Sequence, residues 1–433
     1  MRIAMVSEHA SPLAAVGGGE DSGGQNVHVA ALAEALGRRG HEVVVYTRRD
    51  AKDLPERVPL APRVTVEHIP AGPAGELPKD ALLPHMPAFA EELRRRWRLC
   101  RPDIVHAHFW MSGLAALYAA RNSTGLDGVE RVGDAPGGLR TAIPVVQTFH
   151  ALGVVKRRHH GAGDPSPGSR LRWERWIGRS ADMVIATCRD EVHELLAMGV
   201  PAEQIAVVPC GVDLERFTPD GVRAARNGSL RILSMSRPVP RKGVDLVIAA
   251  LAGLPGAELV IAGGVTPGGG EHPELRRLRA TADHLGVSDR VRLVGQVPRA
   301  EAPALIRSAD VVVSAAWYEP FGMVPLEAMA CGVPVVASAV GGHLDTVEPG
   351  RTGLLVPPGD VAALQQALRQ LLGSQRLREA LGAIAAEKAR ERYGWGRIAA
   401  DTESTYRAVA DHRVLDEAPG ASGVALPELA KGT

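Results

Sequence analysis

The feature that most constrains the fold is an alternation of short apolar runs with longer helical segments along almost the whole chain. The runs are rich in β-branched residues and apolar nearly throughout, which is typical of strands covered on both faces of a parallel sheet. In the first half, the predicted strands span residues 2–7, 42–47, 64–69, 103–108, 144–150, 182–188 and 205–210. In the second half, they span residues 230–236, 258–264, 291–297, 310–315, 334–338 and 353–356.

Strand–helix alternation predicts right-handed βαβ units and therefore α/β domains with doubly wound parallel sheets. A polar stretch containing proline and glycine interrupts the pattern at residues 217–229, where we place a linker. We expect a first domain at 1–215 and a second at 216–394, with ligands bound between them at the carboxyl ends of the strands. A helix at 395–411 is expected to cross back to the first domain, followed by a loose tail at 412–433.

Composition and charge exclude several other classes of protein. Lysine and arginine number 50 against 49 aspartates and glutamates, so the net charge is +1 and a nucleic-acid partner is not expected. No apolar run approaches the roughly 18–20 residues that cross a bilayer, so we expect no transmembrane segment. The N-terminus lacks the plan of a signal peptide, and the four cysteines have no metal-binding spacing. We therefore expect reduced thiols and a cytoplasmic location.

A glycine-rich loop follows the first predicted strand and opens a helix at about Gly24. Glycine-rich sequence before a helix exposes backbone N–H groups at the positive end of the helix dipole, which suits a phosphate. The loop matches neither the dinucleotide fingerprint nor the phosphate-binding loop that ends in Gly-Lys-Ser/Thr. A glycine-rich surface loop is an equally good interpretation of these residues alone.

Two cations lie five residues apart at a strand-to-helix turn of the second half, Arg237 and Lys242. Such a pair can converge on one anion, although a solvated basic turn is the commoner explanation for two such residues. Further on, Glu319 follows a predicted buried strand, and Glu327 lies about two turns into the next helix. The amides near Gly322 open that helix and provide a second anion site. This arrangement suits a sugar diphosphate that carries a ribose, whereas glutamates on an exposed helix would not have such apolar neighbours.

The two glutamates, with Pro-Phe-Gly between them, resemble the E-x7-E signature of the family 4 retaining glycosyltransferases of GT-B fold. Arg237 and Lys242 match the arginine and lysine with which that family binds a diphosphate. The resemblance runs from residue 1 to about residue 411. It implies two Rossmann-like, doubly wound domains facing across a cleft, with a C-terminal helix that crosses back.

Other segments agree with this resemblance. Gly23 and Gly24 match the family's N-terminal glycine turn, and residues 210–219 resemble the segment that closes its first domain. Within the family, the chain looks nearest to the sucrose-phosphate synthases and to the mycothiol glycosyltransferases, which attach N-acetylglucosamine to inositol phosphate. The segments that carry this likeness are residues 21–27, 106–110 and 148–153.

The resemblance implies a nucleoside diphosphate sugar as donor, with a UDP-sugar favoured. Glu327 would accept both ribose hydroxyls, Glu319 would contact the sugar near its C3 hydroxyl, and the base would pack against the strand at 291–295. The residues expected to bind the donor are Gly23, Gly24, Arg237, Lys242, Val294, Glu319, Phe321, Gly322, Met323, Val324 and Glu327.

The resemblance also implies transfer with retention, by attack on the face from which the diphosphate leaves. A leaving phosphate oxygen would take the acceptor's proton, and His108 would lie near the developing oxocarbenium ion, although a histidine at a strand end can also be structural. The expected catalytic set is His108, Arg237, Lys242 and Glu319. No Asp-x-Asp motif occurs in the segments expected at the cleft, so we expect neither a metal nor a cofactor.

The acceptor is expected to be small and polar, and the sequence leaves open whether it is phosphorylated. By resemblance, the residues expected to face it are Asn26, Lys79, His150 and Lys156. Phe109 and Ala151 stand where the mycothiol enzymes have a tyrosine and a threonine that hold the acceptor phosphate. Residues 156–160 predict a mobile basic loop that either clamps an anionic acceptor or is a solvated flap.

Two other function classes stay open at this point, and the sequence does not indicate an oligomeric state. One is a different enzyme on the same fold, such as a sugar-nucleotide epimerase or a phosphorylase, although no pyridoxal-phosphate lysine motif is apparent. The other is a catalytically silent protein that binds sugar nucleotides. The presence of Arg237, Lys242, Glu319 and Glu327 favours an active transferase.

Overall fold

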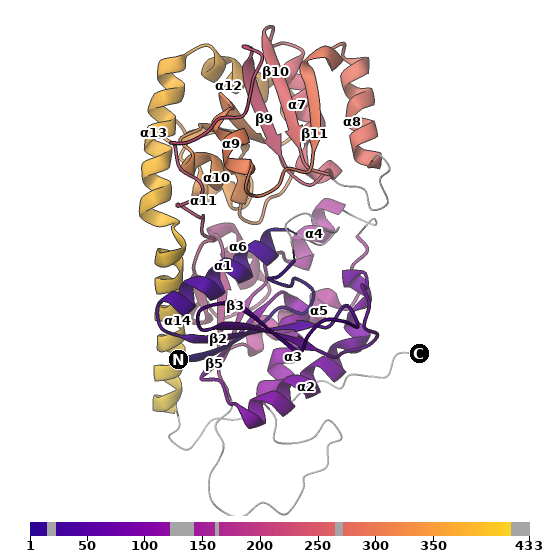
Figure 1. Cartoon of the computed structure of the whole chain (residues 1–433), viewed down its shortest axis with the longest axis vertical. Coiled ribbons are helices and arrows are strands. Elements are labelled where there is room, and N and C mark those ends of the chain that lie inside the picture. Colours follow the sequence, from indigo (N-terminus) through magenta and orange to yellow (C-terminus); the bar gives the residue numbers. More distant parts are fainter. Residues whose placement is uncertain (15–22, 122–142, 161–163, 265–271, 417–433) are drawn as a thin grey trace, which may run out of the picture.

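Two parallel sheets, each flanked by helices, form the molecule (Figure 1). The computed structural model describes residues 1–14, 23–121, 143–160, 164–264 and 272–416, and every structural statement below concerns these residues. The α/β class with two Rossmann-like sheets is confirmed. The glycine-rich loop up to residue 22 and the end of the predicted tail, residues 417–433, lie outside the described residues.

The first sheet has eight strands in the order β3-β4-β2-β1-β5-β6-β7-β8, all parallel except β3, which pairs antiparallel with β4. Its strands are β1 (Arg2–Val6), β2 (Glu42–Arg48), β3 (Arg57–Ala61), β4 (Val64–Ile69), β5 (Ile104–His108), β6 (Val145–Thr148), β7 (Met183–Ala186) and β8 (Ile205–Val207). The associated helices are α1 (Gly24–Arg38), α2 (Met86–Leu99), α3 (Trp110–Arg121), α4 (Gly153–His160), α5 (Arg170–Ser180) and α6 (Arg189–Ala197), with short 3-10 turns at Lys79–Ala81, Leu83–His85 and Ala202–Gln204.

Strand β3 is the one strand of the described chain that the sequence did not predict. It contains Pro59, and proline usually argues against a strand because it cannot donate to the hydrogen-bond ladder. Here β3 pairs only with β4 and forms the edge of the sheet, where a missing donor is tolerated. Pro59 therefore argued against a strand that does form.

The second sheet has six parallel strands in the order β11-β10-β9-β12-β13-β14. Its strands are β9 (Leu230–Met235), β10 (Ala257–Ala262), β11 (Val291–Gly295), β12 (Val311–Ser314), β13 (Val335–Ser338) and β14 (Gly353–Val356). The helices are α7 (Val244–Leu251), α8 (Pro273–His284), α9 (Ala302–Arg307), α10 (Met323–Ala330), α11 (His343–Thr346), α12 (Val361–Leu372) and α13 (Gln375–Arg392), with 3-10 turns η5 (Pro240–Lys242) and η6 (Ser288–Arg290).

Helix α14 (Trp395–Asp416) leaves the second sheet and runs along the side of the first, as Figure 1 shows. Its side chains Trp395, Ile398 and Tyr406 are buried in the same hydrophobic cluster as Ile3 and Val29 of the first sheet and α1. The helix extends to Asp416, so the first residues of the predicted tail are helical and that prediction was wrong for them. No helix of the described part is both long and apolar enough to cross a membrane.

Tyr406 ties α14 to the first sheet through a buried hydrogen bond, and its loss should cost stability. Its hydroxyl lies 2.7 Å from Nδ1 of His106, which is buried in β5. Tyr406→Phe is expected to lower the free energy of unfolding by about 1–3 kcal/mol, because the histidine nitrogen loses its partner. Urea denaturation measures the change. Tyr393→Phe is the control, since that hydroxyl makes only a 3.4 Å contact, and equal losses in the two variants would contradict the assignment.

Candidate active site

The glycine turn of the first domain faces the basic turn of the second. A Cβ added at Gly23 would lie 4.0 Å from Cζ of Arg237, and one added at Gly24 would lie 3.9 Å from Cγ of Met323. Gly23 is the residue before α1, and Met323 is the first residue of α10, so two helix N-termini open near the Arg237 guanidinium. The arrangement concentrates positive charge and N–H donors where an anion would bind.

Lys242 and Glu319 form an ion pair beside this turn, and both side chains are largely buried. Lys242 ends η5, and Glu319 follows β12, so the doubly wound order brings together residues far apart in the chain. Burial opposes ionisation of Glu319, but Lys242, His343 and Arg241 outweigh it and lower the pKa of Glu319 to about 2. Glu319 therefore remains anionic at neutral pH and can accept hydrogen bonds from sugar hydroxyls.

The loop that carries Glu319 is held by close backbone packing. The N–H of Gly342 donates to the carbonyl of Glu319 at 3.0 Å, and a Cβ at Gly342 would overlap the backbone of Phe321. Gly322 has φ +94°, a left-handed conformation that favours glycine, and it immediately precedes α10. The Phe321 side chain is buried in the second-domain core, so its expected contact with a donor stays a prediction.

Glu327 lies buried in α10 and is already paired within the protein. Nη1 of Arg299 donates to Glu327 Oε1 at 2.8 Å, and the Arg299 guanidinium lies over the Phe217 ring at 5.1 Å. Burial raises the pKa of Glu327 despite this partner. Arg299 follows β11 and has no local sequence relation to Glu327, so sequence reasoning missed it. Two further residues are expected to bind the donor. Of these, Val294 in β11 is exposed and Val324 in α10 is half-buried.

His108 ends β5 and belongs to a group of buried histidines. Its Nδ1 lies 3.0 Å from Nε2 of His150, and the two rings stack with centroids 5.2 Å apart. Burial, with the neighbouring histidines, holds the pKa of both well below the usual range, so both are neutral at pH 7. Phe109 and His150 have φ of +81° and +61°, and such left-handed side-chain-bearing residues often mark functional sites. Nε2 of His108 has no partner in the described part of the chain, which favours a functional role over a purely structural one.

Two of the residues expected at the acceptor already use their polar atoms within the protein. Asn26 is buried, accepts a hydrogen bond from the Gly23 N–H at 3.3 Å and donates to the Ser11 carbonyl at 3.0 Å. Lys156 pairs with Asp164 at 2.9 Å and donates to Ser166 at 2.8 Å. Their contact with an acceptor therefore stays a prediction.

Basic groups gather around Phe109, one of them missed by the sequence reasoning. Lys79 Nζ lies 6.0 Å from the Phe109 ring centroid, and the Arg170 guanidinium lies 5.1 Å from it. Arg170 is buried, pairs with Glu174 at 2.7 Å and donates to the Ala151 carbonyl at 2.6 Å. The available signal was the i, i+4 spacing of arginine and glutamate on one helix.

The basic stretch 156–160 was predicted to be a mobile loop, and that prediction was wrong. These residues form most of α4, which begins at Gly153. Arg158 pairs with Glu194 of α6 at 2.7 Å, and the His159 ring stacks on Tyr318 of the second domain with centroids 5.4 Å apart. A run of charged residues with little apolar periodicity hid the helix. Its contacts place α4 between the two domains.

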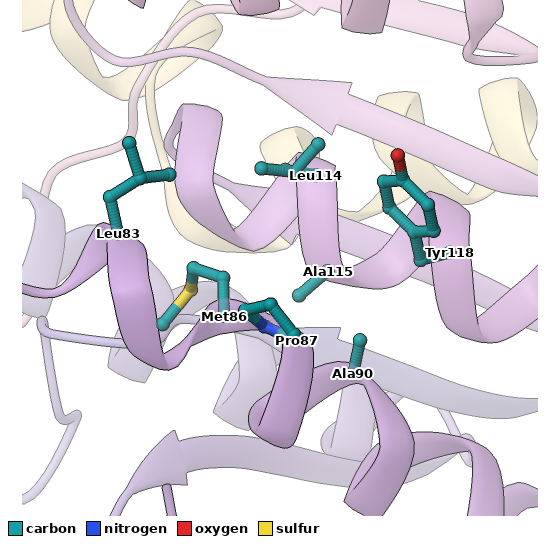
Figure 2. Close-up of a pocket in the computed structure, with 7 residues that line it drawn as sticks. All are labelled: Leu83, Met86, Pro87, Ala90, Leu114, Ala115 and Tyr118. Carbon is teal, nitrogen blue, oxygen red and sulfur yellow. The ribbon is translucent and has the colours of Figure 1, made fainter. Parts of the chain in front are cut away.

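A separate pocket lies outside this region, between α2 and α3 (Figure 2). It is small, with a volume of about 20 Å³, and it is lined by Leu83, Met86, Pro87, Ala90, Leu114, Ala115 and Tyr118. An apolar lining offers nothing to neutralise a diphosphate or bind several sugar hydroxyls. Arg237, Lys242 and Glu319 lie instead in turns and loops at the facing edges of the two domains.

Known proteins with similar sequences are glycosyltransferases. The family model described as Glycosyltransferase Family 4 matches residues 22–216, and the one described as Glycosyl transferases group 1 matches residues 220–388. A D-inositol 3-phosphate glycosyltransferase of Kribbella flavida is 36% identical over 425 residues, which cover 94% of this chain and 95% of the relative.

Solved structures of known proteins share the fold of this chain. A sucrose-phosphate synthase from Thermosynechococcus elongatus superimposes with a TM-score of 0.84 and 31% identity, over 95% of this chain and 99% of that one. Anabaena HepE in complex with UDP-glucose shares the fold at 21% identity, with a TM-score of 0.69 over 94% of this chain and 100% of that one.

The fold and these matches define an enzyme class, the glycosyltransferases with two Rossmann-like domains in the GT-B arrangement. Within that class, the chain belongs to glycosyltransferase family 4. The predicted family and its transferase activity are thus confirmed, whereas the roles of individual residues are developed below as proposals.

Proposed function

We propose that this glycosyltransferase moves a hexosyl group from a UDP-sugar, with retention, to a hydroxyl of a small phosphorylated polyol such as an inositol phosphate. The observation that carries the proposal is the convergence of Arg237, Lys242 and Glu319 opposite the Gly23–Gly24 turn. Two cations and two helix N-termini suit a diphosphate, and a buried carboxylate beside them suits the hydroxyls of the attached sugar.

On the donor side, Arg237 and Lys242 would neutralise the diphosphate as the glycosidic C–O bond breaks. Their effect is largest in the transition state, because the leaving group gains charge there. Glu319 would accept hydrogen bonds from the donor sugar near its C3 hydroxyl. Glu327 would hold the ribose, with its carboxylate oriented by Arg299. Backbone amides at Gly24 and Gly322–Met323 would complete the anion site.

Retention would follow from attack on the same face as the leaving group, with a phosphate oxygen accepting the proton of the acceptor hydroxyl. A retaining glycosidase instead uses two carboxylates about 5 Å apart, one of them a nucleophile. Glu319 is already engaged by Lys242, and Glu327 by Arg299, so neither resembles a free nucleophile. Neutral His108, with an unpartnered Nε2, would contact the donor sugar as positive charge develops on its ring.

On the acceptor side, Lys79 would attract the phosphate beside Phe109, with the buried Arg170–Glu174 pair against the same ring. The relatives' names support a phosphorylated inositol, since they are D-inositol 3-phosphate glycosyltransferases. Phe109 and Ala151 lack the hydroxyls that the mycothiol enzymes have at these positions, so the phosphate would depend more on charge than on hydroxyl donors here. The alternative, a catalytically silent sugar-nucleotide binder, lacks a supporting observation at the site.

Chelation should not lower the transfer rate. Arg237 and Lys242 supply the positive charge that a divalent ion supplies to diphosphates in metal-dependent transferases. Full activity is expected after dialysis against EDTA, measured as UDP release in the presence of acceptor. Loss of activity that returns only with Mg²⁺ or Mn²⁺ would contradict the metal-free donor site.

A donor screen tests the proposed function directly. Purified protein is incubated with uridine, guanosine and adenosine diphosphate sugars, and nucleotide release is followed with and without inositol phosphates. We expect slow hydrolysis of a UDP-sugar alone and faster release with a phosphorylated inositol. Binding of UDP-sugars without turnover, in the presence of every acceptor offered, would favour the silent binder instead.

A further inference from the structure

Three histidines from three different elements converge next to the proposed sugar site. His28 lies in the second turn of α1, His108 ends β5, and His150 follows β6. One ring nitrogen from each lies within 4.8 Å of those of the other two. The ring centroid of His28 lies 5.7 Å from that of His108 and 5.0 Å from that of His150. A set of three close imidazoles is a common ligand set for zinc.

Two ring nitrogens of this group are buried without a hydrogen-bond partner among the described residues. They are Nδ1 of His28 and Nε2 of His108, in side chains that are 4% and 0% exposed. An unsatisfied buried polar atom costs about 1–3 kcal/mol, and native structures usually satisfy such atoms with protein, water or an ion. The unpartnered Nδ1 of His28 therefore points to a ligand that the triad binds, whereas Nε2 of His108 is the atom that the proposed function directs to the donor sugar.

The donor set selects the kind of ligand. All three ligands are imidazoles, which suit zinc and its neighbours in the transition series, whereas Mg²⁺ and Ca²⁺ require oxygen ligands. A tetrahedral ion with Zn–N bonds of 2.0–2.1 Å sets ligand nitrogens about 3.3–3.4 Å apart. The 3.0 Å separation of His108 Nδ1 and His150 Nε2 is already close to that value.

The neighbours of the triad hold its rings in place. The His28 ring meets the Trp395 ring edge-on, with centroids 5.3 Å apart. The His108 ring lies 4.1 Å from the ring of His106, which is itself fixed by Tyr406 and by Thr148. Only a small movement of His28 is needed to complete a three-ligand site, and such ordered surroundings are typical of metal sites.

We propose that His28, His108 and His150 bind a divalent transition ion such as Zn²⁺, with water as the fourth ligand, and that the bound ion inhibits transfer. Inhibition rests on the proposed function, because it assumes that His108 contacts the donor sugar. An ion bound through His108 Nδ1 replaces its hydrogen bond to His150 and places positive charge next to the sugar ring, on which positive charge also develops during transfer. The bound ion therefore opposes transfer, which is compatible with the metal-free turnover that we expect.

Titration of the tag-free, full-length protein with Co²⁺ tests the site. Tetrahedral cobalt absorbs strongly in the visible range, so binding is read without any activity assay. We expect saturation at one equivalent and displacement by Zn²⁺. His28→Phe should weaken binding by about 100-fold or more, since even loss of an outer-shell partner costs 10–100-fold. His193→Phe, on the exposed side of α6, is the matched control and should bind like the parent.

A second ligand variant and an activity measurement complete the test. His150→Asn removes another ligand with a residue that tolerates the left-handed backbone, and thermal melting verifies that both variants are folded. UDP release by the parent should fall with added Zn²⁺, whereas release by His28→Phe should not. Absence of one-equivalent Co²⁺ binding, or binding kept by both folded ligand variants, would overturn the site. Cobalt absorbance does not depend on turnover. The metal site can therefore be tested even if the proposed transfer reaction is not found.

Discussion

Replacing Lys242 with methionine is expected to lower kcat by about 10²–10³-fold, the loss typical when one preorganised charge donor is removed from a transition state. Lys242 is largely buried beside Glu319, so its charge acts in a medium that screens it weakly. The effect should fall on kcat more than on donor KM, because the diphosphate gains negative charge as the C–O bond breaks. Steady-state rates of UDP release over a range of donor concentrations measure both constants.

Lys242→Met also leaves Glu319 without its cation, so two further variants are compared with it. Arg237→Ala removes the other cation without breaking that pair and should give a loss of similar size. Lys52→Met changes an exposed lysine of the first domain and should leave kcat unchanged. Near-normal turnover in folded Lys242→Met and Arg237→Ala would show that this turn is only a basic surface.

Replacing Glu327 with glutamine should raise the donor KM by about 10–100-fold with little change in kcat. A carboxylate that accepts two ribose hydroxyls makes charge-assisted bonds, which exceed neutral ones by about 1–1.5 kcal/mol each. Ribose contacts are the same in the ground and transition states, so their loss appears in KM. Calorimetric titration with UDP measures the affinity directly, and an unchanged affinity would refute the ribose assignment.

Glu258→Gln is a close control for this variant. Glu258 is also buried and paired with an arginine, Arg231 at 2.6 Å, but it lies in β10 and in no predicted site. Both variants break a buried ion pair and should lose stability for the same reason. Only Glu327→Gln should weaken donor binding. Equal weakening in both would assign the effect to general destabilisation of the second domain.

Much of the fold could be predicted because each buried strand is an apolar run that needs no partner to be recognised. Every predicted strand overlaps an observed one. The failures have local causes. Pro59 hid β3 at the sheet edge. The charged run of α4 hid a helix that reaches the core only through its first turn, at Val155, and otherwise contacts Glu194 and Tyr318. Edge strands and helices between domains carry little of the hydrophobic periodicity on which such predictions depend.

The site could be predicted only in part, for a related reason. Glu319 and Glu327 share one short motif, so their spacing was visible in the sequence. Their partners, Lys242 and Arg299, reach them only through the order of strands in the second sheet. The histidine triad also depends on three separate elements, and no single spacing connects His28 to its neighbours.

Retaining transfer to a phosphorylated inositol is tested most directly by the anomeric configuration of the product. UDP-glucose and UDP-N-acetylglucosamine, both α-linked donors, are incubated with the protein and an inositol phosphate, and the purified product is examined by proton NMR. We expect an α-linked sugar on an inositol hydroxyl, with the phosphate group intact and required for efficient transfer. A β-linked product would contradict retention, and equal transfer to unphosphorylated inositol would contradict the role given to Lys79.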